Sequence, residues 1–186
     1  MADASREEEF YTYADILDMD ESVRAEIIDG ELFMMAPPAS NHQFIVMQLA
    51  GQLWQFLRGK SCKVFPAPYG VRLFPRDDLN DDTFLEPDIV VICDPSKIKK
   101  DGCEGAPDMV IEILSPSNTR HEMLLKFKKY LAAGVKEYWV VDGDEKTVEV
   151  HILDKDRHII SIAGENDKIS VTTLPGCTVT LQDLWP

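Results

Sequence analysis

Two short apolar runs dominate the middle of the chain, at residues 89–93 and 109–114. Both are rich in Val and Ile and are bounded by Pro, Gly and Asp, a pattern that predicts β-strands rather than helix segments. We expect these two strands to pair as an antiparallel hairpin. The connection between them, residues 94–106, is long for a hairpin, so it is either a flexible loop or a segment with a small turn of its own.

The rest of the hydrophobic pattern predicts helices and strands on both sides of this pair. Before it we expect a short helix capped by Thr12 (12–19), a hairpin around Asp29-Gly30 (25–28 and 31–35), a helix capped by Ser40 (41–58) and an edge or bent strand interrupted by prolines (63–74). After it we expect a turn (115–119), a helix ended by Gly134 (120–133), a buried strand (137–141), a hairpin (147–153 and 158–162) and short strands in the tail (168–186). The pattern predicts one α/β domain over residues 1–186, with a mixed sheet flanked by helices.

Each apolar strand carries an acid where a buried strand is normally apolar. In an antiparallel pair, the start of the first strand lies beside the end of the second, which brings Asp88 and Glu112 together. Directly opposed residues have Cβ atoms about 4.5–5.5 Å apart, and like charges at that distance destabilise a sheet. A divalent metal between the acids would remove the repulsion, and Mg²⁺ often uses only one or two carboxylates. Alternatively, Asp88 caps its strand after Pro87, and Glu112 faces outward from a half-exposed strand.

The metal hypothesis sets a condition on the strand register. Opposed residues must have numbers whose sum is even and about 200, because a slip of one residue sends one acid to the other face. A second Pro-Asp pair, Pro107-Asp108, does not compete for the site. Asp108 and Glu112 are on one strand, about 13 Å apart at the usual rise per residue, which is too far to share an ion. We therefore expect Asp108 to mark the entry to its strand.

The helix after the second strand carries a ladder of polar residues. Glu122, Lys126 and Tyr130 recur every four residues and so share one helix face, directly after the Glu112 strand. The position of the helix directly after this strand favours a role for the ladder beside the acids. The alternative is that the ladder is only a surface salt bridge. From the pattern alone, Glu26 further upstream is an ordinary exposed strand residue, and His42 is solvated in the first turn of its helix.

The order of these segments resembles a known family. Pro87-Asp88, Glu112 within VIEILSPS, the helix with Lys126 and Tyr130, GVKEYWVVD at 134–142 and EIIDGELFMMAPPASNHQ at 26–43 are similar to the Uma family. That family is a group of proposed restriction endonucleases within the PD-(D/E)xK nuclease superfamily. The resemblance covers most of residues 13–142.

The resemblance implies an αβββαβ core and assigns roles to the candidate residues. Asp88 and Glu112 would hold the metal, Lys126 would orient water or stabilise charge on the phosphate, and Glu26 would complete the acid set. Glu122 and Tyr130 would fix the lysine, and His42 would lie near the acids. Two departures from the pattern stand out. Glu112-Ile113-Leu114 lacks the superfamily lysine, whose place Lys126 takes, and Glu122 replaces the family's usual Asp.

Composition and charge restrict the partners. With 19 Lys and Arg against 33 Asp and Glu, the formal net charge is −14, which is the wrong sign for a general nucleic-acid binder. Any DNA contact must be local, and the dense basic groups are Lys97, Lys99 and Lys100 in the connection and Arg120, His121, Lys126, Lys128 and Lys129 on the helix. The acidic loop 76–82 lacks calcium-loop spacing and is expected to be solvated.

The cysteines, the first ten residues and the lengths of the apolar runs indicate where in the cell the protein is expected. Cys62, Cys93, Cys103 and Cys177 show no CxxC spacing, so we expect reduced thiols in a cytoplasmic protein, with Cys62 and Cys93 packed in strands. The first ten residues are acidic and lack an apolar core, so we expect neither a signal peptide nor an anchor there. No apolar run is long enough to span a membrane.

These observations lead to one preferred function and two alternatives. The preferred function is an endonuclease that hydrolyses phosphodiester bonds, with DNA as substrate and Mg²⁺ as cofactor; Mn²⁺ would also serve, and a homodimer is compatible with cutting both strands. The first alternative is a catalytically inactive nucleic-acid or protein binding module that keeps the nuclease fold. The second is a metal-dependent hydrolase of small phosphate esters. For the lysine, we expect Lys126→Ala to leave folding nearly unchanged while turnover falls by about 10²–10³.

Overall fold

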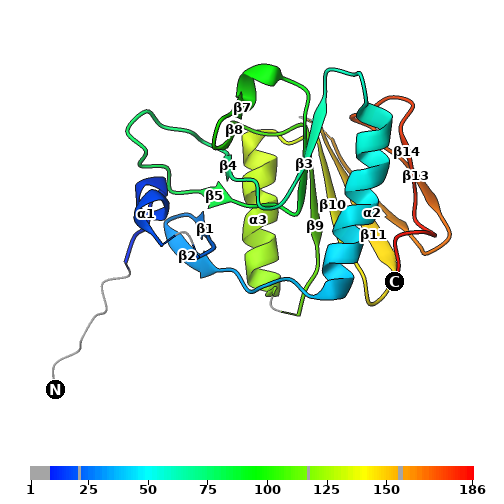
Figure 1. Ribbon diagram of the computed structural model, residues 1–186, viewed down its shortest axis with the longest axis horizontal. Coiled ribbons are helices and arrows are strands. Elements are labelled where there is room, and N and C mark those ends of the chain that lie inside the picture. The colour runs from blue at the N-terminus through cyan, green and yellow to red at the C-terminus, as the bar shows by residue number, and fades with distance from the viewer. Residues whose placement is uncertain (1–8, 21, 117, 155–156) are drawn as a thin grey trace.

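The computed structural model describes residues 9–20, 22–116, 118–154 and 157–186. Its centre is a six-stranded mixed sheet in the order β12-β11-β10-β9-β6-β3 (Figure 1). Its strands, in chain order, are β3 (Lys63–Pro66), β6 (Ile89–Ile92), β9 (Met109–Ile113), β10 (Glu137–Asp142), β11 (Thr147–Asp154) and β12 (Arg157–Ala163). All neighbours pair antiparallel except β9 and β10, which are parallel and are joined by a helix as parallel strands require.

Two long helices cover opposite faces of the central sheet. The buried stripe of α2 (Ser40–Leu57) packs with Ile89 and Ile111 on one face, and Tyr130 of α3 (Arg120–Ala133) packs with Val90 and Val110 on the other. The order α2, β3, β6, β9, α3, β10 confirms the expected αβββαβ core. Within the described ranges, no helix combines the length and the apolar character needed to cross a membrane.

The β6–β9 pair confirms the expected antiparallel arrangement and its register. Ile89 lies opposite Ile111, and Val90 lies opposite Val110. One step further along the same register, Asp88 stands opposite Glu112, on the face that carries α3. The connection between the strands is the second of the two expected forms, because it contains a 3₁₀ turn, η1 (Pro95–Lys97), and the strands β7 (Ile98–Lys99) and β8 (Gly102–Glu104).

A second sheet is built from the N-terminal hairpin and from two insertions in the core. Its order is β2-β1-β5-β4-β8-β7, with β1 (Ala25–Ile28), β2 (Glu31–Met34), β4 (Val71–Arg72) and β5 (Phe84–Leu85) beside β7 and β8. The hairpin turn is confirmed, since Asp29 and Gly30 have φ of 54° and 82°, as a type I′ turn requires. The short helix α1 (Tyr13–Asp18) follows Thr12, whose backbone N–H donates to the Asp15 carboxylate at 2.7 Å.

The C-terminal elements close the α2 face. β13 (Lys168–Ser170) and β14 (Thr178–Thr180) form a small antiparallel pair, and Leu181 and Leu184 are fully buried after it. The expected hairpin of β11 and β12 is confirmed, as are the edge position of β3 and the end of α3 at Gly134. Residues 155–156 of that hairpin turn, residue 117 of the expected turn after β9, and residues 1–8 lie outside the described residues.

Two local predictions are wrong. Ser40 does not cap α2 but is its first helical residue, and the extended residue Ala39 occupies the capping position after the two prolines. The acidic loop is not fully solvated, because Asp81 is 1% exposed. Its carboxylate accepts hydrogen bonds from the Arg72 guanidinium and from the backbone N–H of Arg76. Arg72 is buried on β4 (Val71–Arg72) of the second sheet, and its charge therefore requires this acid as a partner.

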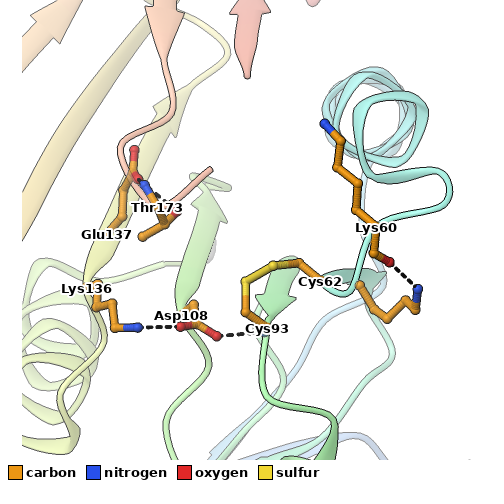
Figure 2. Close-up of a disulfide and its surroundings, with 8 residues drawn as sticks. Lys60, Cys62, Cys93, Asp108, Lys136, Glu137 and Thr173 are labelled. Carbon is orange, nitrogen blue, oxygen red and sulfur yellow. Dashed lines mark hydrogen bonds and ion pairs between the residues drawn. A yellow bond between two sulfur atoms is a disulfide. The ribbon is translucent and has the colours of Figure 1, made fainter. Parts of the chain in front are cut away.

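The prediction of four reduced cysteines is also wrong, because Cys62 and Cys93 form a disulfide (Figure 2). Neither lies inside a strand. Lys63 of β3 pairs with Ile92 of β6, so one residue beyond this pair Cys62 faces Cys93. The free thiols Cys103 and Cys177 are buried, and burial raises the pKa of Cys103 to about 11.

The disulfide should contribute measurably to stability. It links residues 31 positions apart, and closing a loop of that size is worth about 3–4 kcal/mol by chain entropy. Urea unfolding with and without a phosphine reductant should differ by about that amount. In Cys62→Ala/Cys93→Ala, the reductant should have no effect. Equal unfolding midpoints for oxidised and reduced wild type would contradict the cross-link.

Candidate active site

Asp88 and Glu112 lie side by side at one end of the β6–β9 pair. Glu112 belongs to β9, and Asp88 directly precedes β6, so the strand register places both side chains on the face that carries α3. Both acids line a cavity of about 440 Å³. The expected proximity of these two residues is therefore confirmed at the level of the backbone.

Glu112 is 5% exposed and is held from α3. Its Oε1 accepts a hydrogen bond from the Tyr130 hydroxyl at 2.6 Å, and the Lys126 ammonium lies 3.2 Å from the same oxygen. Lys126 and Tyr130 are four residues apart, so both project from the same face of the helix onto this carboxylate. The alternative of an outward, half-exposed Glu112 is wrong.

Glu26 reaches the same lysine from the second sheet. It is 1% exposed on β1, and its Oε2 lies 2.8 Å from the Lys126 nitrogen. Its Oε1 accepts a hydrogen bond from the backbone N–H of Glu86 at 2.8 Å. Glu26 is thus not an exposed strand residue. One buried ammonium joins two buried carboxylates, one from each sheet.

Asp88 is held through one of its two oxygens. Oδ2 accepts a hydrogen bond from the backbone N–H of Ile113 at 2.8 Å, and the Nε2 atom of His42 lies 3.1 Å from the same oxygen. His42 is in the first turn of α2 and lines the cavity, so it is not simply solvated. The helix on one face of the sheet therefore contributes a side chain to the end where the acids meet.

Burial and local charge shift the pKa values of these groups. Burial raises the pKa of Glu112 to about 7, with Glu26 and Asp88 adding to the rise and Lys126 opposing it. Burial alone would lower the pKa of Lys126, but Glu112 and Glu26 raise it overall, so the side chain is a cation. Burial also acts to lower the pKa of His42, and its contact with Asp88 outweighs this and raises it.

The donor set fits a hard divalent cation. Within the described residues, the Oδ1 of Asp88 and the Oε2 of Glu112 have no hydrogen-bond partner, while the other oxygen of each is held. No group of three or more His, Cys, Asp or Glu side chains in those residues is arranged to bind a metal. Two carboxylates suffice for Mg²⁺, which commonly completes its shell with water and substrate phosphate oxygens.

Two supporting residues act on partners other than those expected. Tyr130 donates its hydrogen bond to Glu112 rather than fixing Lys126. Glu122 lines the cavity, but its Oε1 accepts a hydrogen bond from the Asn118 side-chain amide at 3.2 Å. It therefore ties the helix to the turn after β9, and it reaches the lysine only through its charge, which helps to raise the pKa of Lys126.

Three of the eight basic residues named from the sequence make contacts away from the acids. Lys97 donates to the carbonyl oxygen of Ala106 at 2.7 Å, and the Lys129 ammonium pairs with Asp29. Lys99 lies 3.8 Å from Glu104. Of the basic residues named from the sequence, Lys126 alone lines the cavity among the described residues.

Sequence reasoning missed a second charged pair at the cavity. The Arg24 guanidinium lies 2.7 Å from the Glu86 carboxylate, and both residues line the cavity. A signal for Glu86 was present, because it precedes Asp88 by two residues and alternation along an extended segment places both on one face. Arg24 carries no such signal, since it precedes β1 and meets Glu86 only because β1 pairs with β5 in the second sheet, 62 residues along the chain.

Comparisons with known proteins agree with this architecture. A family model described as "Uma2: Putative restriction endonuclease" matches residues 7–182. A crystal structure described as "a putative nuclease belonging to DUF820 from Anabaena variabilis" superposes with a TM-score of 0.75 at 22% identity, covering 94% of this chain and 97% of that one. The chain therefore has the restriction endonuclease-like fold.

One curated relative is also similar in sequence. It is "Uncharacterized protein slr1290" of Synechocystis sp., 28% identical over 105 residues. The match covers 56% of this chain and 53% of that protein, so it spans about half the length of the relative.

The burial of Lys126 between two carboxylates argues against the expectation that its removal leaves folding nearly unchanged. Lys126→Met should destabilise the protein by about 3–5 kcal/mol, because it leaves two buried carboxylates without a cation. Tyr130→Phe should lower the free energy of unfolding by about 1–3 kcal/mol. The exposed Lys128→Met should lower it by less than about 0.5 kcal/mol. Urea unfolding measures all three. Adding Glu26→Gln and Glu112→Gln to Lys126→Met should restore much of the loss, and a Lys126→Met variant as stable as wild type would contradict the buried pairing.

Proposed function

The chain belongs to the Uma2 family of putative restriction endonucleases, and on this basis we propose that it is a metal-dependent endonuclease that hydrolyses phosphodiester bonds in DNA. The observation that carries the proposal is the pair of opposed carboxylates, Asp88 and Glu112, at the cavity. Each has one oxygen held by the protein and one oxygen without a hydrogen-bond partner in the described residues. Such a pair favours the binding of a cation over a purely structural role.

Asp88 and Glu112 would hold the metal, which is Mg²⁺ in this proposal, with Mn²⁺ as an alternative. When bound, such an ion supplies a more acidic water molecule and stabilises charge on the phosphate oxygens. His42 and the Ile113 backbone N–H keep Asp88 in its orientation. Tyr130 does the same for Glu112. These contacts leave one oxygen of each carboxylate without a hydrogen-bond partner among the described residues, on side chains that line the cavity.

Lys126 would act as a fixed positive charge beside the scissile phosphate. Its ammonium stays protonated because Glu112 and Glu26 raise its pKa, so it can orient water or stabilise negative charge but does not serve as a base. Glu26 positions it at 2.8 Å from the opposite side. The lysine on the helix thus supplies the charge that the superfamily pattern places two residues after the second acid.

A catalytically inactive binding module is a second candidate function, and two observations favour it. The net charge is −14, and the Lys126 ammonium is already compensated by two carboxylates. A protein of this kind would bind nucleic acid or protein without cutting it. Cleavage and binding assays therefore need to be run on the same preparations.

Cleavage should depend on Asp88 and on a divalent metal. We expect cutting of DNA with Mg²⁺ or Mn²⁺ and none with EDTA, and a rate for Asp88→Asn lower by at least about 10²–10³. The cleavage rate of His42→Ala should fall by about 10–100-fold, as expected for a residue that orients a metal ligand. The matched control is Asp108→Asn, which changes the other Pro-Asp acid at the far end of the same strand pair and should cut like wild type. Binding of DNA without cleavage in every metal would favour the inactive module.

Metal binding should also stabilise the folded protein. A ligand that binds only the native state raises stability by mass action, about 2.7 kcal/mol at 100 times its Kd. Differential scanning calorimetry should therefore show a higher Tm with millimolar Mg²⁺ or Mn²⁺ for wild type and Asp108→Asn, and a much smaller rise for Asp88→Asn. No shift for wild type, with or without an oligonucleotide, would exclude Asp88 and Glu112 as metal ligands.

A further inference from the structure

A second cavity, of about 380 Å³, lies beside the acid cavity. It is formed between α3 and the β10–β11 part of the central sheet, and its walls include Phe127, Tyr138 and His151. Ser115 and Asn118, in the turn after β9, line both cavities. A single turn of the chain therefore separates the two, and a molecule that extends over this turn can reach both.

Three rings that pack against one another form part of the wall of this cavity, beside aliphatic and polar side chains. The Phe127 ring lies 5.9 Å from the Tyr138 ring and 5.2 Å from the His151 ring, measured between centroids. His158 of β12 stacks on His151 at 5.0 Å, with the ring planes inclined by 22°. Tyr138 and His151 are buried, whereas Phe127 is partly exposed, so the Phe127 ring is the face on which a planar ligand can stack. Such stacking is worth about 1–3 kcal/mol per nucleobase.

One residue of the cavity wall carries a buried polar group without a partner. The hydroxyl of Tyr138 is buried and has no hydrogen-bond partner among the described residues, although the residue is 1% exposed. A buried hydroxyl left without a partner costs about 1–3 kcal/mol. The Glu149 carboxylate lies on the same wall, where one of its oxygens is 2.7 Å from the His151 ring. A ligand with a flat apolar face and a polar edge would match this combination.

We propose that the second cavity takes one unstacked nucleobase of the substrate strand, while a phosphate of the same strand lies at Asp88 and Glu112. The inference rests on the proposed nuclease function and names its substrate class. Because a base must leave its stack to enter, at a cost of a few kcal/mol in a duplex, the substrate is single-stranded or locally unpaired DNA. Arg120, at the first turn of α3 and on the cavity wall, suits the connecting sugar-phosphate.

The charge distribution agrees with this substrate class. A rigid duplex contacts a protein over a broad basic surface, whereas this chain has a net charge of −14 and places its lysines in local contacts. A strand that gains its affinity from a stacked base needs fewer phosphate contacts. The alternative occupant is an apolar side chain of a second protein copy, because Leu124 on the cavity wall and Ile160 and Ile162 on β12 are exposed.

The first test needs binding but no cleavage. Single-stranded DNA containing 5-iodouracil would be irradiated with Asp88→Asn in Mg²⁺, and the cross-linked peptides would be identified by mass spectrometry. We expect the cross-link at Phe127, Tyr138 or His151, and at least about threefold less product from the corresponding duplex. Cross-links confined to other surfaces would overturn the proposal. The proposal would also be overturned if the cavity residues were covered only in a dimer that forms at high protein concentration, since that outcome assigns the cavity to a second copy.

The second test removes a single oxygen atom. Tyr138→Phe keeps the ring and deletes the unpaired hydroxyl, so its Tm should equal or exceed that of wild type, while KM for single-stranded DNA rises about threefold to tenfold with little change in kcat. The matched control is Tyr69→Phe, whose hydroxyl donates to the Gly102 carbonyl oxygen at 3.0 Å in the second sheet. It should lower the Tm and leave KM unchanged. An unchanged KM for Tyr138→Phe would overturn the role of the hydroxyl.

The outcomes separate this proposal from the nuclease function. Metal-dependent cleavage together with cross-links outside the cavity would refute the base site and leave the nuclease intact. Cross-links inside the cavity without cleavage in any metal would refute the nuclease function and assign the cavity to a nucleic-acid binding module. Equal cleavage rates for single-stranded and duplex DNA would contradict the proposed substrate class.

Discussion

The ammonium of Lys126, buried between Glu26 and Glu112, is the contact on which the rest of the structure depends. The three groups come from α3, β1 and β9, and each is at most 5% exposed. Removing any one charged group from water costs several kcal/mol unless its partners arrive with it. The docking of the second sheet, the position of α3 and the orientation of Glu112 are therefore coupled. Two carboxylates on one cation also leave an excess negative charge, which adds to the rise that burial causes in the pKa of Glu112.

The two acids at the cavity depend on a separate constraint, the register of β6 and β9. A slip by one residue would send Asp88 to the α2 face and would break its hydrogen bond with the Ile113 backbone N–H. His42 adds a contact from α2, so both helices contribute to the same sheet end. Cys62 and Cys93 tie β3 to the other end of β6, where they hold the edge strand in register.

Helix α3 serves two cavities with two of its faces. Lys126 and Tyr130 are four residues apart and face the acids, whereas Phe127 is one position on and lines the aromatic cavity. A rotation of about 100° per residue is enough to separate the two surfaces. The turn after β9 forms the boundary between them, since Ser115 and Asn118 touch both. This arrangement is why the proposed site for a base lies so close to the proposed site for a phosphate.

The sequence by itself determined most of the helices and strands and the pairing of Asp88 with Glu112, because these follow from local periodicity, turn residues such as Asp29-Gly30 and a hairpin between neighbouring strands. The αβββαβ order was implied by the resemblance to the Uma family, and the structure confirms it. The spacing of Lys126 and Tyr130 likewise follows from helix geometry. Only the tertiary structure decided which partners meet across long separations. The burial of Glu26 and the Arg24–Glu86 pair depend on how the second sheet folds and docks, and the disulfide depends on the register of β3 against β6. Such contacts leave no local pattern in the chain, because their free energy is gained only when distant segments are packed together.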